Sequence, residues 1–266
     1  MSKGWETTTL SSAEEALREL TELHGKRWLC RGQLKCYDGL MPSIDREPRL
    51  NLSRLEKLKL ERQSIDIFRS TVRFFTEPGE QGALADDIVA LMVLRHYEVP
   101  TRLLDWSGSP FVAAYFAAES HDEEDGEIWT FDEPLYERRG KDQWIQWPET
   151  TSDGSGDPSK FDAKLTAFSL NEPPPWFICA FYTTGFPRQN AQKSAYTMTA
   201  QFGHDHATAI ENLLSDSSRY RRYVVKASLK RTLRRILQEK HGIWRGSLFP
   251  DSGGAAGTAR RVVFPE

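Results

Sequence analysis

The stretch from residue 86 to residue 117 constrains the fold most, because its sequence marks where each element starts and stops. A helix predicted over Asp86–Tyr97 opens with two acidic residues, where the helix dipole favours negative charge, and must end before Pro100. Thr101–Trp106 is predicted as a strand. Ser109-Pro110 then fits the N-cap and first position of a second helix over Phe111–Ala117, whose small residues indicate close packing on a sheet. The segment therefore predicts a helix, a strand and a helix around one sheet.

The rest of the chain predicts further elements of both kinds. Ser12 and Glu15 have the form of a capping box, so a first helix starts at Ser11 or Ser12. Leu52–Phe75 is predicted as a long amphipathic helix, ended by Pro78-Gly79, with apolar positions at Leu55, Leu58, Ile65, Phe68, Val72 and Phe75. Strands are predicted over Arg27–Arg31 (followed by a turn at Gly32-Gln33), Glu127–Phe131, Trp176–Thr184, Ala195–Ala200 and Tyr223–Ser228, and a basic helix over Leu229–His241 with Gly242 as its C-cap. We expect a single α+β domain over residues 1–266, in which 150–160 is a flexible polar loop.

Composition excludes several classes of protein. The 266 residues carry a net charge of −3, which gives no whole-chain attraction for DNA or membranes. The three cysteines form no Cys-x-x-Cys pair, and the histidines have no carboxylate or cysteine cluster at ligand spacing, so neither a disulfide framework nor a metal site is expected. No apolar run approaches the roughly 20 residues of a membrane span, and the first residues lack the apolar stretch of a signal peptide, so none is expected. We expect a soluble, cytoplasmic protein.

Two motifs could bind a ligand. In Trp28–Gln33, Arg31 stands at a strand edge before Gly32; its planar guanidinium suits phosphate, and glycine lets a ligand approach the backbone. The alternative is a surface arginine before a turn. In Leu94–Pro110, polar residues are dense within an apolar segment, which favours a site. Asp105 could instead pair with an arginine or cap a turn.

Two further segments are polar or basic. Residues 186–196 carry amides and cations ahead of a strand, which is weak evidence alone because amides are frequent in loops. Residues 219–245 hold ten cations and the single acid Glu239. Such a segment could bind a nucleic-acid backbone or an acidic partner protein, or it could be a solvated face that balances the acidic stretches at Asp122–Asp125 and Glu77–Asp87.

The order of these motifs resembles the FRG domain. The features are Trp-x-x-Arg-Gly-Gln from Trp28, then the stretch from His96 to Ala117, Ala-Gln at Ala191-Gln192, and the ending from Gly242 to Asp251. The resemblance spans about residues 28–251. Cys30 stands where the family has its name-giving phenylalanine, and the usual glycine after the Gln-containing motif is replaced near Lys193-Ser194.

The FRG domain is similar in motif order to ADP-ribosyltransferases, which use NAD as a substrate and have a mixed or split sheet with flanking helices. This likeness implies catalytic roles for Arg31, Asp105 and Gln192, with Arg31 on the NAD phosphate and the other two at the ribose. A glutamine can hydrogen-bond a ribose but cannot act as a base. The NAD-binding residues it implies are Arg31, Gly32, Gln33, His96, Tyr97, Thr101, Arg102, Trp106 and Ser107.

The resemblance also implies a biological role. We expect a toxin-type enzyme of bacterial defence that transfers ADP-ribose from NAD to a macromolecule, RNA or protein, and that an antitoxin protein controls. The alternatives are NAD hydrolysis, with water as acceptor, and a catalytically inactive nucleotide- or RNA-binding module.

Overall fold

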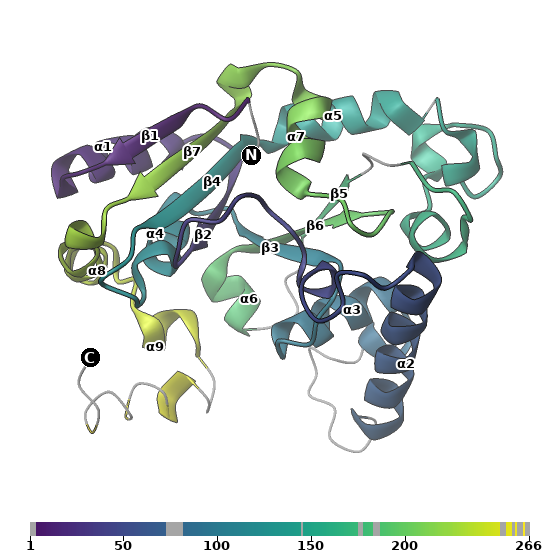
Figure 1. Cartoon of the computed structure of the whole chain (residues 1–266), viewed down its shortest axis with the longest axis horizontal. Helices are drawn as coiled ribbons and strands as arrows, with labels where there is room; N and C mark the ends of the chain where they lie inside the picture. The colour runs from purple at the N-terminus through teal and green to yellow at the C-terminus, as the bar shows by residue number, and fades with distance from the viewer. Residues whose placement is uncertain are drawn as a thin grey trace.

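Seven strands form one mixed sheet in the order β1-β7-β4-β2-β3-β6-β5 (Figure 1). The computed structural model describes residues 4–72, 82–144, 146–174, 178–182 and 187–250, together with 254–256, 259 and 263. β1 and β7 run parallel, and every other neighbouring pair is antiparallel. The strands are β1 (Thr7–Leu10), β2 (Trp28–Gln33), β3 (Leu103–Ser107), β4 (Gly126–Asp132), β5 (Ile178–Tyr182), β6 (Ser194–Thr199) and β7 (Tyr220–Val225).

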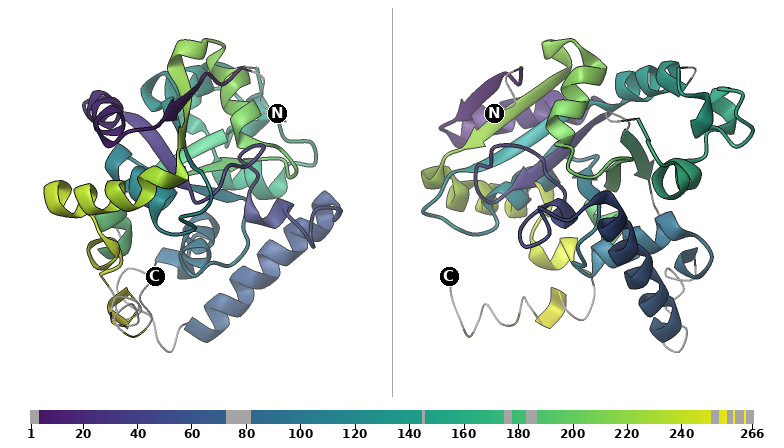
Figure 2. Two further views of the ribbon diagram at one scale, coloured as in Figure 1. Left: turned by 60° about the vertical axis from the view of Figure 1, so that its left-hand side comes forward. Right: turned by 45° about the vertical axis from the view of Figure 1, so that its right-hand side comes forward.

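Helices cover both faces of this sheet (Figure 2), which confirms the α+β class. One core joins strands β1, β7, β4 and β2 to α1 (Ala13–His24), α4 (Pro110–Ala118) and α8 (Ala227–His241). The opposite face packs on α5 (Glu133–Trp144) and α7 (His206–Leu214), and a third core joins β3 and β6 to α2 (Arg54–Val72) and α3 (Asp87–His96). The remaining helical segments are α6 (Pro187–Gln192), α9 (Arg245–Leu248) and the short turns η1 (Ser43–Asp45), η3 (Pro148–Thr150), η4 (Pro158–Lys160), η5 (Leu165–Ser169) and η6 (Ser217–Arg219).

The predicted helix, strand and helix are present. The Asp86 side chain accepts from the Val89 N–H at the start of α3, and Ser109 caps α4 with Pro110 in its first turn. The strand between them starts at Leu103 rather than at Thr101, because the backbone ahead of Leu103 forms hydrogen bonds outside the sheet. The Thr101 carbonyl accepts from the Ile44 N–H at 3.3 Å, and the Arg102 N–H donates to the Glu61 side chain of α2.

The turn predicted at Gly32-Gln33 is wrong, because both residues continue β2 and pair with β4. The need for glycine comes from α4, which packs directly on this strand. A Cβ at Gly32 would lie 1.9 Å from the Ala113 carbonyl oxygen and 2.7 Å from the Ala117 nitrogen. The small residues of α4 therefore pack closely on the sheet, as predicted, and Gly32 makes that contact possible.

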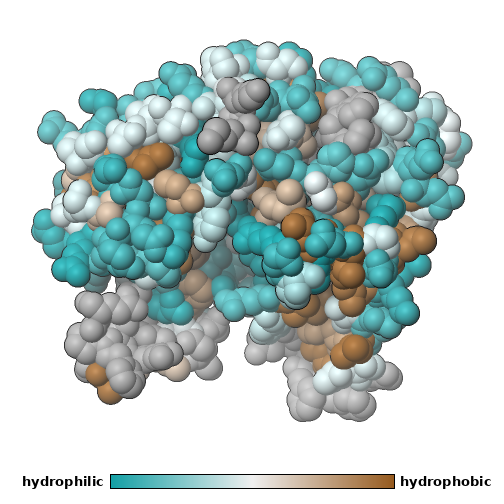
Figure 3. All heavy atoms as spheres, viewed as in Figure 1, coloured by the Kyte–Doolittle hydropathy of each residue, from teal (hydrophilic) through white to brown (hydrophobic). Residues whose placement is uncertain are grey.

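Helix α2 is more exposed than its sequence predicted. Leu58 and Ile65 are buried, but Leu55 is 77% exposed and Ile67 67% exposed. Hydrophobic surface is correspondingly visible on this side of the molecule (Figure 3). Phe75 and the predicted stop at Pro78-Gly79 lie outside the described residues.

Other elements differ from prediction at their boundaries. The strand predicted over Tyr223–Ser228 ends at Val225, because α8 already starts at Ala227. β5 lies within the predicted range Trp176–Thr184, whose flanks are outside the described residues. The polar stretch 150–160 contains η4 and a bridge between Thr151 and Phe161.

Strand β1 and helix α5 were not predicted. β1 is short and pairs along one side with β7. α5 contains Gly140, which lowers helix propensity, while Pro134 stands in the first turn, where proline is tolerated. The start of the helix is capped by Asp132, whose side chain accepts from the Leu135 N–H at 3.1 Å. In the described part of the chain, none of the helices combines the length and apolar character that crossing a bilayer requires.

Candidate functional site

The site forms where the sheet opens between β2 and β3. These neighbouring strands are registered through one pair, Cys30 opposite Ser107, whereas β2 pairs along its whole length with β4. Next to that pair the Arg31 guanidinium spans the opening, and its Nη1 donates to the Asp105 carbonyl oxygen at 2.6 Å. A side chain thus satisfies a backbone acceptor where strand pairing stops.

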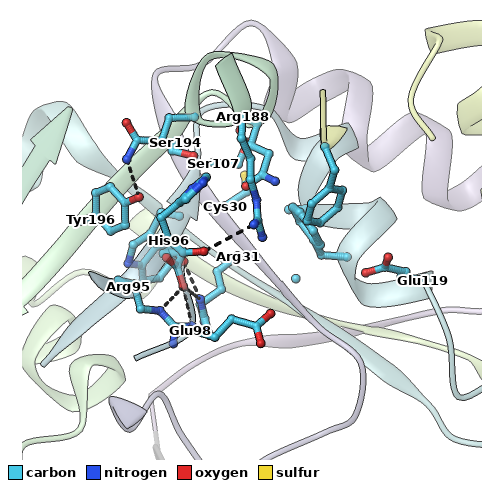
Figure 4. Close-up of a pocket in the computed structure, with 18 of the residues that line it drawn as sticks. Cys30, Arg31, Arg95, His96, Glu98, Ser107, Glu119, Arg188, Ser194 and Tyr196 are labelled. Carbon is cyan, nitrogen blue, oxygen red and sulfur yellow. Dashed lines mark hydrogen bonds and ion pairs between the residues drawn. The ribbon is translucent and has the colours of Figure 1, made fainter. Parts of the chain in front are cut away.

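A pocket of about 420 Å³ lies at this opening. Its lining comes from β2, β3 and β6, from α4, from the end of α3 and from the segments around α6 and α9 (Figure 4). Arg31, Asp105 and Gln192, which the sequence placed in three distant segments, all line it. The three segments therefore meet at one cleft. The other lining residues include Gly32, Arg95, His96, Glu98, Trp106, Ser107, Phe116, Glu119, Arg188, Gln189, Tyr196, Arg245 and Phe249.

Two arginines hold the Asp105 carboxylate. Arg95, in the last turn of α3, places Nε at 2.8 Å and Nη2 at 2.7 Å from Asp105 Oδ2, and Arg31 Nη1 lies 3.6 Å from the same oxygen. Burial alone raises the pKa of Asp105, but the charges of Arg95 and Arg31 outweigh it and hold the pKa below its usual value. Asp105 therefore stays ionised and orients the two guanidinium groups, which makes it a poor proton acceptor.

Arg31 is itself strongly shielded from water. Its side chain is 13% exposed, and burial lowers its pKa to about 10, although the Asp105 charge opposes this shift. The group remains a cation at neutral pH. Because its position is fixed by both the carbonyl and the carboxylate of Asp105, an anion in the pocket meets a preorganised donor.

Gln192 connects the sheet to the C-terminal part of the chain. Its backbone carbonyl accepts from Ser107 Oγ at 2.7 Å, and its side-chain Nε2 donates to the Leu248 carbonyl oxygen at 3.0 Å. The amide thus holds α9 against the pocket. This is a positioning contact that the sequence did not predict.

An aromatic wall completes the pocket on that side. The Phe249 ring contacts two guanidinium groups, with Arg188 Cζ 4.3 Å and Arg245 Cζ 4.9 Å from its centroid. Arg245 also forms an ion pair with Glu119 on the far end of α4. Arg188 Nη1 points to the carbonyl oxygen of His96 at 3.4 Å, which links the α6 segment to α3.

Four of the predicted NAD-binding residues do not line the pocket. Gln33 is buried and donates to Glu127 Oε1 at 2.7 Å, whereas Tyr97 is 55% exposed at the end of α3. Thr101 is buried and its carbonyl holds the loop at Ile44. Arg102 is completely buried in an ion pair with Glu61. Thr101 and Arg102 lie ahead of β3, where contacts with Ile44 and Glu61 hold them away from the pocket.

Trp106 lines the pocket, and a hydrogen bond to a residue outside the pocket holds its indole ring. Its Nε1 donates to Thr197 Oγ1 at 2.7 Å, and that hydroxyl lies 2.8 Å from Nδ1 of the buried His206. Burial lowers the pKa of His206 to about 3, so the ring is neutral. The sequence did not single out Arg95, Glu98, Arg188 or Phe249 for any role, although each lies inside a segment that it marked.

The basic segment 219–245 is largely neutralised. Most of its cations form ion pairs, and many of the acidic partners lie on β4 or in the loop ahead of it. Arg222 pairs with Glu127, Lys226 with Asp125, and Arg231 and Arg234 with Asp122. Lys230 is buried and donates to three backbone carbonyls. Arg219, Arg235 and Arg245 also have carboxylate partners. This pairing matches the alternative in which the segment balances the acidic stretch near Asp122.

Within the described residues, no group of three or more His, Cys, Asp or Glu side chains is placed to hold a metal ion. The pocket instead offers cations, rings and amides, which suit an anionic organic ligand.

Residues 26–126 match the family model of the FRG domain. This part of the chain is similar to the FRG domain. The matched part holds Arg31 and the strand that carries Asp105, and it ends before the segments of Gln192 and Phe249 that close the pocket. Comparisons with curated proteins and with solved structures found no match.

Proposed function

We propose that the chain binds NAD in this pocket and transfers its ADP-ribose moiety to a macromolecule. The observation that carries the proposal is that Arg31, Asp105 and Gln192 meet around one cavity, although they come from three distant segments. Its volume of about 420 Å³ falls in the range of roughly 300–1,000 Å³ usual for small-molecule sites.

The arginines support an anionic ligand such as a pyrophosphate. Arg31, Arg95 and Arg188 reach the same cavity from β2, α3 and α6. A planar guanidinium can bind two phosphate oxygens at once, and the bonds of Arg31 and Arg95 to Asp105 fix their orientation before a ligand arrives.

The rings support a ligand with flat heterocycles. Phe249 and Phe116 both line the cavity, with their centroids 6.2 Å apart in an edge-to-face arrangement. Aromatic side chains and guanidinium planes stack on nucleobases. In NAD, these surfaces would receive the nicotinamide or the adenine ring.

The reaction breaks the bond between the nicotinamide nitrogen and ribose C1′. Preorganised donors stabilise the charge that develops as this bond breaks. Ser107, Gln192 and the Arg31–Asp105 pair line the part of the pocket formed by β3 and the start of β6, and we assign them to holding the phosphate and ribose.

The acceptor is RNA or protein, and the enzyme acts as a cytoplasmic toxin under the control of an antitoxin. Because ion pairs occupy most cations of residues 219–245, we assign acceptor binding to the mouth of the pocket rather than to this segment.

A second candidate is a nucleotide-binding module without catalysis. Two observations favour it: Asp105 is held between two arginines, and the Gln192 amide is engaged with the Leu248 carbonyl. Neither residue is then placed to act as a base, and binding alone would remain.

One assay separates these functions. The purified chain is incubated with NAD labelled in its adenylate phosphate, together with total RNA or cell lysate. Label on RNA or protein supports ADP-ribosyl transfer, free ADP-ribose supports hydrolysis, and NAD binding without either product supports the binding module. Absence of NAD binding would contradict all three. An Arg235→Lys variant, changed on the outer face of α8, serves as a control.

A further inference from the structure

Helix α3 ends in a turn that normally requires glycine. The Glu98 N–H donates to the Arg95 carbonyl at 3.0 Å, and the Val99 N–H donates to the Leu94 carbonyl at 2.9 Å. This pair of bonds is the Schellman arrangement, whose central residue adopts a left-handed conformation. Glu98 occupies that position with φ of 63°. A glutamate therefore stands where glycine would be less strained, and strain of this kind gathers at functional positions.

The turn projects Glu98 into the wall of the pocket. Glu98 lines the cavity and is exposed, so its carboxylate can meet both a ligand inside and a nucleophile arriving from solvent. Figure 4 draws it in the group with Arg31 and Arg95, while Glu119 stands apart from that group.

The pocket has three carboxylates, and two of them are engaged. Asp105 is bound by Arg95 and Arg31. Glu119 is paired with Arg245 and lies 3.4 Å from the Tyr115 hydroxyl. Among the residues that the structure describes, the Glu98 carboxylate has no hydrogen-bond partner, and its neighbouring charge is Arg95.

We propose that Glu98 is the catalytic base of this pocket and takes the proton from the attacking group of the acceptor. The inference rests on the proposed function. The bond from C1′ to the nicotinamide nitrogen breaks, and its electron pair goes to the ring nitrogen, so nicotinamide leaves neutral. The acceptor forms the new bond to C1′, and its proton passes to Glu98 and then to solvent.

This assignment separates binding from proton transfer. Arg31, Arg95 and Asp105 form the fixed, ionised part of the site that holds the ligand. Glu98 is exposed and lines the same cavity as these arginines, so an acceptor arriving from solvent can reach it. It also resolves the difficulty that Gln192 cannot serve as a base.

Two variants test the role. Glu98→Gln keeps the size of the side chain and removes its basicity, and Glu98→Gly relaxes the turn. Nicotinamide release from NAD and label transfer are measured for the full chain, with NAD affinity measured in parallel. We expect both variants to lose at least about 100-fold in turnover while NAD affinity changes less than about threefold. Glu98→Asp should recover part of the rate.

The outcomes are distinct. Glu137→Gln, on the exposed face of α5, should behave as wild type. Turnover in Glu98→Gln within about threefold of wild type would overturn the role of Glu98 and leave the proposed function standing. A wild-type chain that binds NAD without consuming it would overturn both. Because glycine suits the turn, loss of activity in Glu98→Gly cannot be attributed to unfolding if its melting temperature is unchanged or higher.

Discussion

The buried ion pair between Arg102 and Glu61 gives a direct prediction about stability. Both side chains are fully buried. The Glu61 carboxylate accepts from the Arg102 backbone N–H at 3.2 Å, from Nε at 2.9 Å and from Nη2 at 2.5 Å. Arg102 Nη1 donates to the Ala167 carbonyl at 3.0 Å. In Glu61→Gln the volume is preserved, but the guanidinium charge is left with backbone carbonyls and faces an amide that carries donors of its own.

The expected cost follows from that geometry. Breaking a buried pair by neutralising one partner destabilises a protein by about 3–5 kcal/mol. For a chain of this size, each kcal/mol lowers the melting temperature by about 2–4 °C, so a fall of roughly 6–20 °C is expected. Glu137→Gln removes an exposed pair with Lys141 on α5, and should cost about 0.5 kcal/mol or less.

Urea titration and thermal melting of both variants measure this difference. NAD affinity of the folded Glu61→Gln protein should match wild type, since Arg102 lies outside the pocket. A Glu61→Gln protein that is within about 1 kcal/mol of wild type, or that loses NAD binding while staying folded, would refute the structural role of Arg102.

Three further predictions concern single positions. Gly32→Ala should destabilise by at least about 1–3 kcal/mol in a thermal melt, because its Cβ meets the α4 backbone, while Gly140→Ala, which meets nothing within 4 Å, should be neutral or stabilising. Glu98→Gly should raise the free energy of unfolding by up to about 1 kcal/mol in urea; a loss would contradict the strain inferred at this turn. The pKa of His206 is lowered to about 3, so below about pH 6.5 the unfolded chain takes up a proton that the folded chain does not. Stability should then fall by up to about 1.4 kcal/mol per pH unit from this group as pH drops from about 6.5 towards 3, a slope that His206→Gln should reduce.

Local chemistry in the sequence predicted the part of the fold around the site. Asp86, Pro100 and Ser109-Pro110 act on their own neighbours, so the ends of α3 and α4 could be predicted without tertiary contacts. α5 was missed although its cap, Asp132, is local, because Gly140 lowers the helix propensity and packing on the sheet stabilises the helix.

The family resemblance implied that Arg31, Asp105 and Gln192 share one site, and an arginine partner for Asp105 was the alternative to catalysis, but the specific partners of these residues were not predicted. The ion pair between Arg95 and Asp105 depends on how α3 packs beside β3. The hydrogen bond from Gln192 to the Leu248 carbonyl depends on where the C-terminal segment meets the pocket. Both contacts depend on how separate elements pack, and neither leaves a periodic pattern in the sequence. For Arg102 the family motif predicted ligand binding, but the structure pairs its guanidinium with Glu61 of helix α2.

The most direct test of the central claim is the affinity of the pocket for NAD in wild type and in Arg31→Lys. Lysine keeps the charge but loses the fork that Arg31 presents, and a lost charge-assisted bond is worth about 1.5–3 kcal/mol. Calorimetry should therefore show NAD binding to wild type and to the Arg235→Lys control, with affinity reduced roughly 10- to 100-fold in Arg31→Lys. Equal affinity in all three proteins, or none in any, would show that the three segments do not build an NAD site.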